Sequence, residues 1–176
     1  MKNLFSILGV MLLFFITSCS TVHVTSDYDR NANFDAYQSF AFHEKGLNDL
    51  KMNDLDKRRI VTAITNELKA KGMTVSSYET AADLLINISA KKNTKVDVEV
   101  NPWYNPWWGY GPYWGSPNRV RQYKEGTIIL DFVDRRNNTL VWQGVGEGLN
   151  ISAIESKAER IPVAVKEILE KYPPKK

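Results

Sequence analysis

The pattern that most constrains the fold of this chain is the run TIILDFVD at residues 127–134. Its apolar side chains alternate, so Ile128, Leu130 and Phe132 share one face of a strand. The polar run RRNN that follows predicts a turn, and residues 140–148 then predict a strand that returns antiparallel. A hairpin with one apolar face has to be covered by other elements, so the rest of the chain must supply that cover.

Six further segments carry the period of a strand or a helix. Strands are predicted at residues 21–26, 39–43, 83–90 and 95–100. A helix is predicted to begin at Asn53 or Asp54, whose side chain can cap its first turn, and to end at Gly72. A last helix ends before two prolines near the end of the chain. The order favours an α+β fold: an antiparallel sheet of about five to six strands with two helices packed on one face.

The apolar positions of these elements predict one shared core. Each of its members lies on the apolar stripe of a helix or the apolar face of a strand. We expect these residues to be buried together: Ile64, Leu68, Ile88, Leu130, Phe132, Trp142, Val165 and Leu169.

The first residues, 1–18, have the order of a secretory signal, with Lys2 before a short apolar core. That core is shorter than the roughly 20 apolar residues of a spanning helix. The run ITSC that ends at Cys19 resembles the lipobox of bacterial lipoproteins. This resemblance implies diacylglycerol on the Cys19 sulfur, cleavage before Cys19 and acylation, as with palmitate, of the new amine. The alternative is an ordinary cleaved signal beside an incidental cysteine.

The residue after the cysteine is Ser20. By the best-known bacterial sorting rule, the absence of aspartate there implies the outer membrane, and we expect the periplasmic face. Residues 19–176 suit a single domain in length. The net charge of +3 is too small for a nucleic-acid-binding surface.

Four segments carry a wider resemblance. They are VHVTSDYDRNANFDAYQSFAF, AADLLINISA, EGTIILDFVDRRNNTLVWQGVGEG and IPVAVKEILEKYPP, in this order. Together they resemble the bacterial lipoprotein family catalogued as domain of unknown function 4136 (DUF4136). The resemblance implies lipoprotein status and the α+β fold, and it carries over no catalytic residue.

No set of residues predicts catalysis, a metal or a cofactor. His23 and His43 are the only histidines and fit structural or surface roles. Asp27, Asp29 and Asn31 have the spacing of calcium ligands, but the loop lacks the glycine and the final glutamate that calcium requires. We expect these three side chains to shape a turn instead. Asp131 and Asp134, three apart on a strand, point to opposite faces.

The run NPWYNPWWGYGPYWG at residues 101–115 lies in a Pro/Gly-rich loop predicted over 101–118. Its rings are Trp103, Tyr104, Trp107, Trp108, Tyr110, Tyr113 and Trp114. Three interpretations stay open: a lid over the protein's own sheet, an exposed element that binds an envelope protein or a glycan, and a segment that dips into the membrane.

These features together predict a non-enzymatic binding or adaptor lipoprotein of the cell envelope. The alternative is a carbohydrate- or peptidoglycan-active enzyme, which needs two carboxylates facing a groove. A cleft with two acidic side chains beside the aromatic loop would favour the enzyme.

The lipobox yields the first prediction. The variant Cys19→Ala should leave the protein soluble in the periplasm or held as a precursor, because the acceptor sulfur is gone. Metabolic labelling with a fatty-acid analogue measures this. Continued label on the variant would mean that Cys19 is not the acylated residue.

Overall fold

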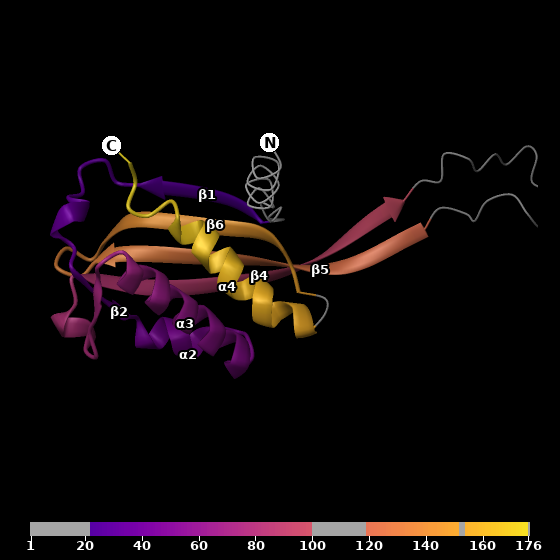
Figure 1. The fold of residues 1–176 in the computed structure, drawn as a ribbon, viewed down its shortest axis with the longest axis horizontal. Helices are drawn as coiled ribbons and strands as arrows, with labels where there is room; N and C mark the ends of the chain where they lie inside the picture. The colour runs from indigo at the N-terminus through magenta and orange to yellow at the C-terminus, as the bar shows by residue number, and fades with distance from the viewer. Residues whose placement is uncertain (1–21, 100–118, 152–153, 176) are drawn as a thin grey trace, which may run out of the picture.

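The computed structural model describes residues 22–99, 119–151 and 154–175 (Figure 1). The strands are β1 (His23–Tyr28), β2 (Ser39–Phe42), β3 (Thr74–Val75), β4 (Leu84–Glu99), β5 (Arg119–Asp134) and β6 (Thr139–Asn150). The helices are α2 (Glu44–Asp49), α3 (Asp54–Ala70) and α4 (Ile154–Leu169), with 3₁₀ turns η2 (Phe34–Ala36) and η3 (Glu79–Ala81). None of the described helices is long and apolar enough to cross a membrane. The fold is α+β.

The six strands form one sheet in the order β1-β6-β5-β4-β2-β3. The prediction of a purely antiparallel sheet is wrong, because β2 runs parallel to both β3 and β4. The chain between β2 and β4 passes through α2 and α3 before it returns to the sheet. Such a crossover joins parallel strands, whereas a tight turn joins antiparallel ones. The helix predicted between these two strands was therefore evidence for parallel pairing. The alternation of side chains within a strand does not distinguish parallel from antiparallel pairing.

The central hairpin is longer than predicted. The segments 83–90 and 95–100, expected as two strands, belong to the single strand β4, and β5 begins well before Thr127. All sixteen residues of β4 pair with β5, from Leu84↔Asp134 to Glu99↔Arg119. The polar residues that seemed to separate the two segments remain in the ladder, because backbone groups pair regardless of the side chain.

Helix α3 ends as its sequence predicts at both termini. The Asn53 side chain accepts a hydrogen bond from the Asp56 amide at 2.8 Å, which satisfies one of the first-turn N–H groups. At the other end Gly72 has φ +88°, and the Met73 amide donates to the Leu68 carbonyl. This left-handed glycine closes the helix with little strain.

The short helix α2 was not predicted from the sequence. Its N-terminal residue His43 makes no side-chain capping bond. Instead Glu79, from the distant turn η3, accepts a bond from the Glu44 amide at 2.7 Å and contacts His43 Nδ1 at 3.2 Å. The cap comes from a residue that is close only in the folded chain, so no local pattern announces this helix.

The predicted core is confirmed, since all eight of its residues are buried in one cluster. Aromatic rings lie at its centre: the Phe132 ring centroid is 4.8 Å from that of Trp142 and 4.7 Å from that of Tyr172. Helices α3 and α4 contribute to the same cluster and cross the sheet on the viewer's side in Figure 1. Gly144 lets α4 approach β6, because a Cβ there would collide with Ile168 and Trp142.

The core generates a stability prediction. Leu130→Ala and Leu169→Ala remove side chains that are 0% exposed, so each should lower the free energy of unfolding by about 2–5 kcal/mol. Leu140→Ala is the matched control, because Leu140 is 50% exposed on the neighbouring strand. It should stay within about 0.5 kcal/mol of wild type. Urea titrations of the three variants measure this, and equal midpoints would contradict the core assignment.

Candidate functional site

In the sequence, the aromatic segment connects the outer ends of β4 and β5. Strand β6 pairs with β5 only as far as Glu125↔Asn150. Beyond that point residues 94–99 and 119–124 pair with each other as a two-stranded ribbon, which extends past the helices in Figure 1. The aromatic run 101–115 connects the paired ends Glu99 and Arg119. The hairpin therefore places Glu99 and Arg119, the described residues that flank this segment, beyond the part of the sheet that β6 covers.

The predicted site residues themselves lie outside the described residues. These are the seven rings of the aromatic segment and the lipid-acceptor Cys19. The chain enters the described part at Val22, and β1 then begins with His23 opposite Glu147 near the end of β6. The N-terminal side of the chain and the outer hairpin thus leave the sheet at the same end.

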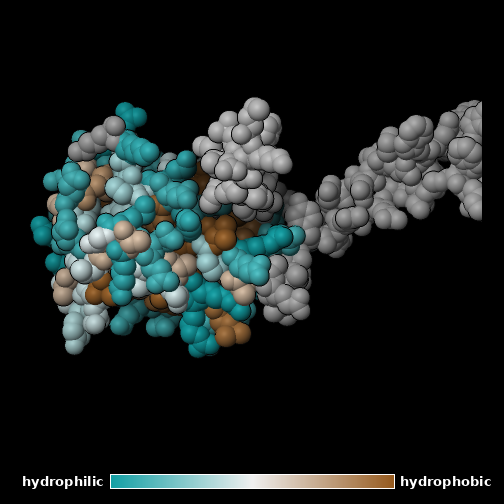
Figure 2. All heavy atoms as spheres, in the orientation of Figure 1, coloured by the Kyte–Doolittle hydropathy of each residue, from teal (hydrophilic) through white to brown (hydrophobic). Residues whose placement is uncertain are grey.

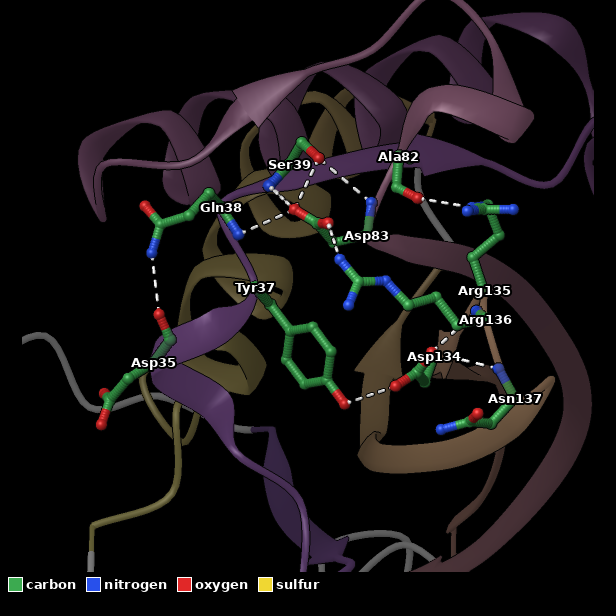
Figure 3. Close-up of polar contacts among 10 residues, drawn as sticks. All are labelled: Asp35, Tyr37, Gln38, Ser39, Ala82, Asp83, Asp134, Arg135, Arg136 and Asn137. Atoms are coloured by element: carbon green, nitrogen blue, oxygen red, sulfur yellow. Dashed lines mark hydrogen bonds and ion pairs between the residues drawn. The ribbon is translucent and has the colours of Figure 1, made fainter.

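A polar junction occupies the opposite end of the sheet (Figure 3). The Asp83 carboxylate accepts hydrogen bonds from the Gln38 amide at 3.1 Å, the Ser39 amide at 3.0 Å and the Ser39 hydroxyl at 2.8 Å. Its other oxygen lies 3.7 Å from the Arg136 guanidinium. Asp83 thereby ties the start of β2 to the start of β4.

The hydrogen bonds at Asp83 also set its protonation. Burial by itself raises the pKa of this carboxyl, but the bonds from Ser39 and Gln38 and the charge of Arg136 outweigh burial and hold the pKa below its usual value. Asp83 is therefore ionised at neutral pH.

Asp134 is the second carboxylate of this junction. It is buried, and it accepts a hydrogen bond from the Tyr37 hydroxyl at 3.0 Å and another from the Arg136 amide at 2.7 Å. Burial and then the contact with Asp134 raise the pKa of Tyr37 to about 12. Asp134 therefore fixes the β5–β6 turn and links it to Tyr37, the residue that follows η2.

A cavity of about 260 Å³ lies here, and Asp29, Asp83 and Asp134 are among its lining residues. The enzyme would need its two carboxylates beside the aromatic segment. This cavity lies instead at the end of the β4–β5 hairpin opposite Glu99 and Arg119. At about 3.3 Å per residue, β4 runs roughly 50 Å from Leu84 to Glu99. Asp83 and Asp134 are also held by donors from their own neighbourhood. We therefore interpret these two carboxylates as structural groups.

The two remaining acidic motifs have structural roles as well. Asp29 accepts a bond from the Asn31 amide at 2.8 Å, as expected for a turn. Asp27 instead lies within β1 opposite Gln143, so the expectation that it shapes the turn is wrong, and its carboxylate accepts a bond from the Tyr28 amide at 2.8 Å. Asp131 accepts a bond from the Gln143 side chain at 2.6 Å across the sheet. Among the described residues, no group of three or more His, Cys, Asp or Glu side chains could hold a metal ion.

The polar junction was missed from sequence. Its members Ser39, Asp83 and Asp134 lie at the start of β2, just before β4 and at the end of β5, positions that are distant along the chain. Only the parallel pairing of β2 with β4 brings Ser39 to Asp83, and that pairing was itself not predicted. A serine at the start of one strand and an aspartate before another would have been the signal, but single residues of these types are too common to be specific.

The ionised state of Asp83 yields a pH prediction. Asp83→Asn should lower the free energy of unfolding at pH 7 by about 1–3 kcal/mol, because three donors lose their charged acceptor. The folded-state pKa is depressed, so the stabilisation is complete above the ordinary carboxyl pKa and is lost as the pH falls below it. The gap between wild type and variant should therefore shrink in melts taken from pH 6 down to pH 3.

The matched control for this prediction is Asp35→Asn, which changes an exposed aspartate in the same region. It should stay within about 0.5 kcal/mol of wild type at every pH. A gap between wild type and Asp83→Asn that does not depend on pH would contradict the role given to this carboxylate.

Solved structures share this fold. A DUF4136 family protein from Bacteroides thetaiotaomicron VPI-5482 is 22% identical with a TM-score of 0.52, over 87% of this chain and 95% of that one. A PDZ domain protein from Parabacteroides distasonis ATCC 8503 is 15% identical with a TM-score of 0.54, over 89% of this chain. This chain spans 37% of the length of that protein. Identities this low show the fold alone.

Sequence comparison gives the family. No curated protein sequence matches the chain significantly. The model of the family described as "Domain of unknown function (DUF4136)" matches residues 24–174, which include every described strand and helix except the first residue of β1. The chain therefore belongs to the DUF4136 family.

Proposed function

We propose that this protein is an outer-membrane lipoprotein, anchored through Cys19, that binds a partner in the cell envelope with the aromatic segment 101–115 and catalyses no reaction. The observation that carries the proposal is the β4–β5 ribbon, which continues past the last pair of β5 with β6 and ends at Glu99↔Arg119. A paired ribbon is a stiffer mount than a free loop, so it reduces the entropy lost when the segment binds.

The composition of the segment supports a contact surface. Trp and Tyr offer large apolar area together with a polar group, and they are enriched at the energetic centres of interfaces. A ligand can be an envelope protein or a glycan, since both present faces on which such rings stack. The lid interpretation is disfavoured, because the flanking residues Glu99 and Arg119 end the ribbon, beyond the pairs that β5 makes with β6.

The position of the N-terminal side of the chain supports the link to a membrane. Only Ser20 and Thr21 lie between Cys19 and Val22, so the three Cα–Cα steps span at most about 10 Å. A lipid on Cys19 would therefore hold the hairpin end of the sheet close to the bilayer surface. Rings in segment 101–115 would then work near the membrane, where Trp and Tyr are favoured.

The enzymatic alternative has no support among the described residues. Glycoside chemistry needs an acid and a base that face the substrate. Asp83 and Asp134 lie at the far end of the sheet and are held by neighbouring donors. The DUF4136 description names no activity.

The test replaces residues 101–115 by a Gly/Ser linker of equal length. The expected result is an unchanged melting temperature, because the segment is attached beyond the core, together with the loss of cross-linked partners in whole cells. A melting temperature lowered by several degrees would contradict the binding proposal in favour of the lid.

A photoreactive amino acid at position 108 identifies what the segment touches. The matched control carries it at position 78, because Tyr78 is 72% exposed near β3, away from the hairpin. Cross-links to one protein or glycan from position 108 but not from position 78 support a partner. Cross-links from position 108 to phospholipid alone would instead support the membrane-dipping interpretation.

A further inference from the structure

A second cavity lies at the base of the hairpin, distinct from the polar junction. Its volume is about 400 Å³, and it is enclosed by the first half of α3, the first half of α4 and the helix-covered face of the sheet. Three strands or strand ends and two helices contribute to its apolar lining, which includes Ala90, Ile128, Leu149, Ile151, Ile60 and Ile161. The cavity is therefore a gap in the packing between helices and sheet where the core reaches the ribbon.

The polar lining of this cavity is cationic. Lys51, Lys91, Lys92 and Lys157 contribute to it, and Asp56 is its acidic member. The first three lysines are exposed. A cluster of like charges beside an apolar surface attracts a ligand that has both an anionic group and an apolar body.

Asp56 does not cancel this positive charge. It is 5% exposed, with Arg59 at 2.6 Å on one oxygen and Lys157 at 3.1 Å on the other. Burial by itself raises the pKa of Asp56, but the bonds from Lys157, Arg59 and Asn53 outweigh burial and hold the pKa below its usual value. One carboxylate is thus shared between two cations, and the rim lysines remain in addition.

The size of the cavity restricts the ligand. Small-molecule sites range over about 300–1,000 Å³, and this cavity is near the lower limit. A single alkyl chain fits that range, whereas a phospholipid with two chains needs more space. Most of the face seen in Figure 2 is hydrophilic, with only small apolar groups. An apolar chain would therefore find little other apolar surface on this face.

We propose that this cavity binds a single-chain anionic amphiphile of the fatty-acid class. The alkyl chain lies on Ile128, Leu149 and Ile151, and the carboxylate faces Lys51 and Lys92 at the rim. This site is independent of segment 101–115, so it adds a second ligand to the proposed function and does not rest on it.

Calorimetric titration of the full-length chain with sodium dodecanoate tests the proposal. The chain carries Cys19→Ala so that no acyl chain of its own competes, and the titrant stays below its micellar concentration. Dodecyltrimethylammonium is the matched probe, with the same chain and the opposite charge. We expect saturable binding of one dodecanoate and at least about tenfold weaker binding of the cationic probe. Dodecanoate affinity should also fall with added salt, which screens exposed charges.

Two variants locate the site. Ala90→Phe places a ring in the cavity from a half-buried strand position, and should abolish dodecanoate binding. Lys92→Glu reverses the charge of an exposed side chain outside the core, so the fold should be unchanged. It should weaken dodecanoate binding about five- to tenfold. Lys171→Glu is the control, because this exposed lysine follows α4 and lines neither cavity. It should bind as the parent does.

Several outcomes would overturn the proposal. They are the absence of saturable binding, equal affinity for the two probes, and unchanged affinity in both Lys92→Glu and folded Ala90→Phe. If Ala90→Phe does not fold by circular dichroism, Lys92→Glu decides alone. The linker variant of 101–115 should still bind dodecanoate, and loss of binding there would place the ligand on the aromatic segment and contradict this site.

Discussion

The ladder between β4 and β5 is the constraint on which the other features depend. Its inner pairs, such as Ile86↔Phe132, place apolar residues under α3 and α4, and its outer pairs continue without them. The same ladder of backbone hydrogen bonds therefore runs through the core and continues into the ribbon that extends beyond it. Backbone pairing makes this continuity available because it does not require an apolar side chain at every position. The polar junction lies at one end of the ladder, and the ribbon forms its other end.

The parts of the fold that local chemistry determines were predictable from the sequence. Asn53 caps α3 and Gly72 ends it, because both effects act within one turn of the helix. The face shared by Ile128, Leu130 and Phe132 follows from alternation alone, and it is buried. Strand β2 was predicted at residues 39–43, but its parallel pairing was not, since its partner is determined by the crossover and not by its own four residues. The helix α2 depends on Glu79, a cap supplied from elsewhere in the chain.

The candidate sites also differ in whether the sequence alone could reveal them. The aromatic segment is conspicuous in sequence because its composition suits neither helix nor strand, and the structure adds where its two ends are held. The lysine-rimmed cavity had no sequence signal at all. Its lining includes residues of α3, α4 and three strands or strand ends, and residues such as Ala90 and Lys92 look ordinary until the fold places them around the same cavity as Lys157. Asp29 was expected to shape a turn, and its carboxylate accepts a bond from the Asn31 amide.

The unbroken register of the hairpin limits how its length can vary. Between Leu84 and Glu99 every residue of β4 has one partner in β5, with no bulge between these two strands. Successive residues of a strand face opposite sides. Lengthening each strand by one residue would therefore turn the end of the ribbon over, and lengthening each by two would restore its orientation farther from the core. An insertion in one strand alone would need a bulge. The reach of the hairpin is thus adjustable only in steps, and the step size is set by the pleat.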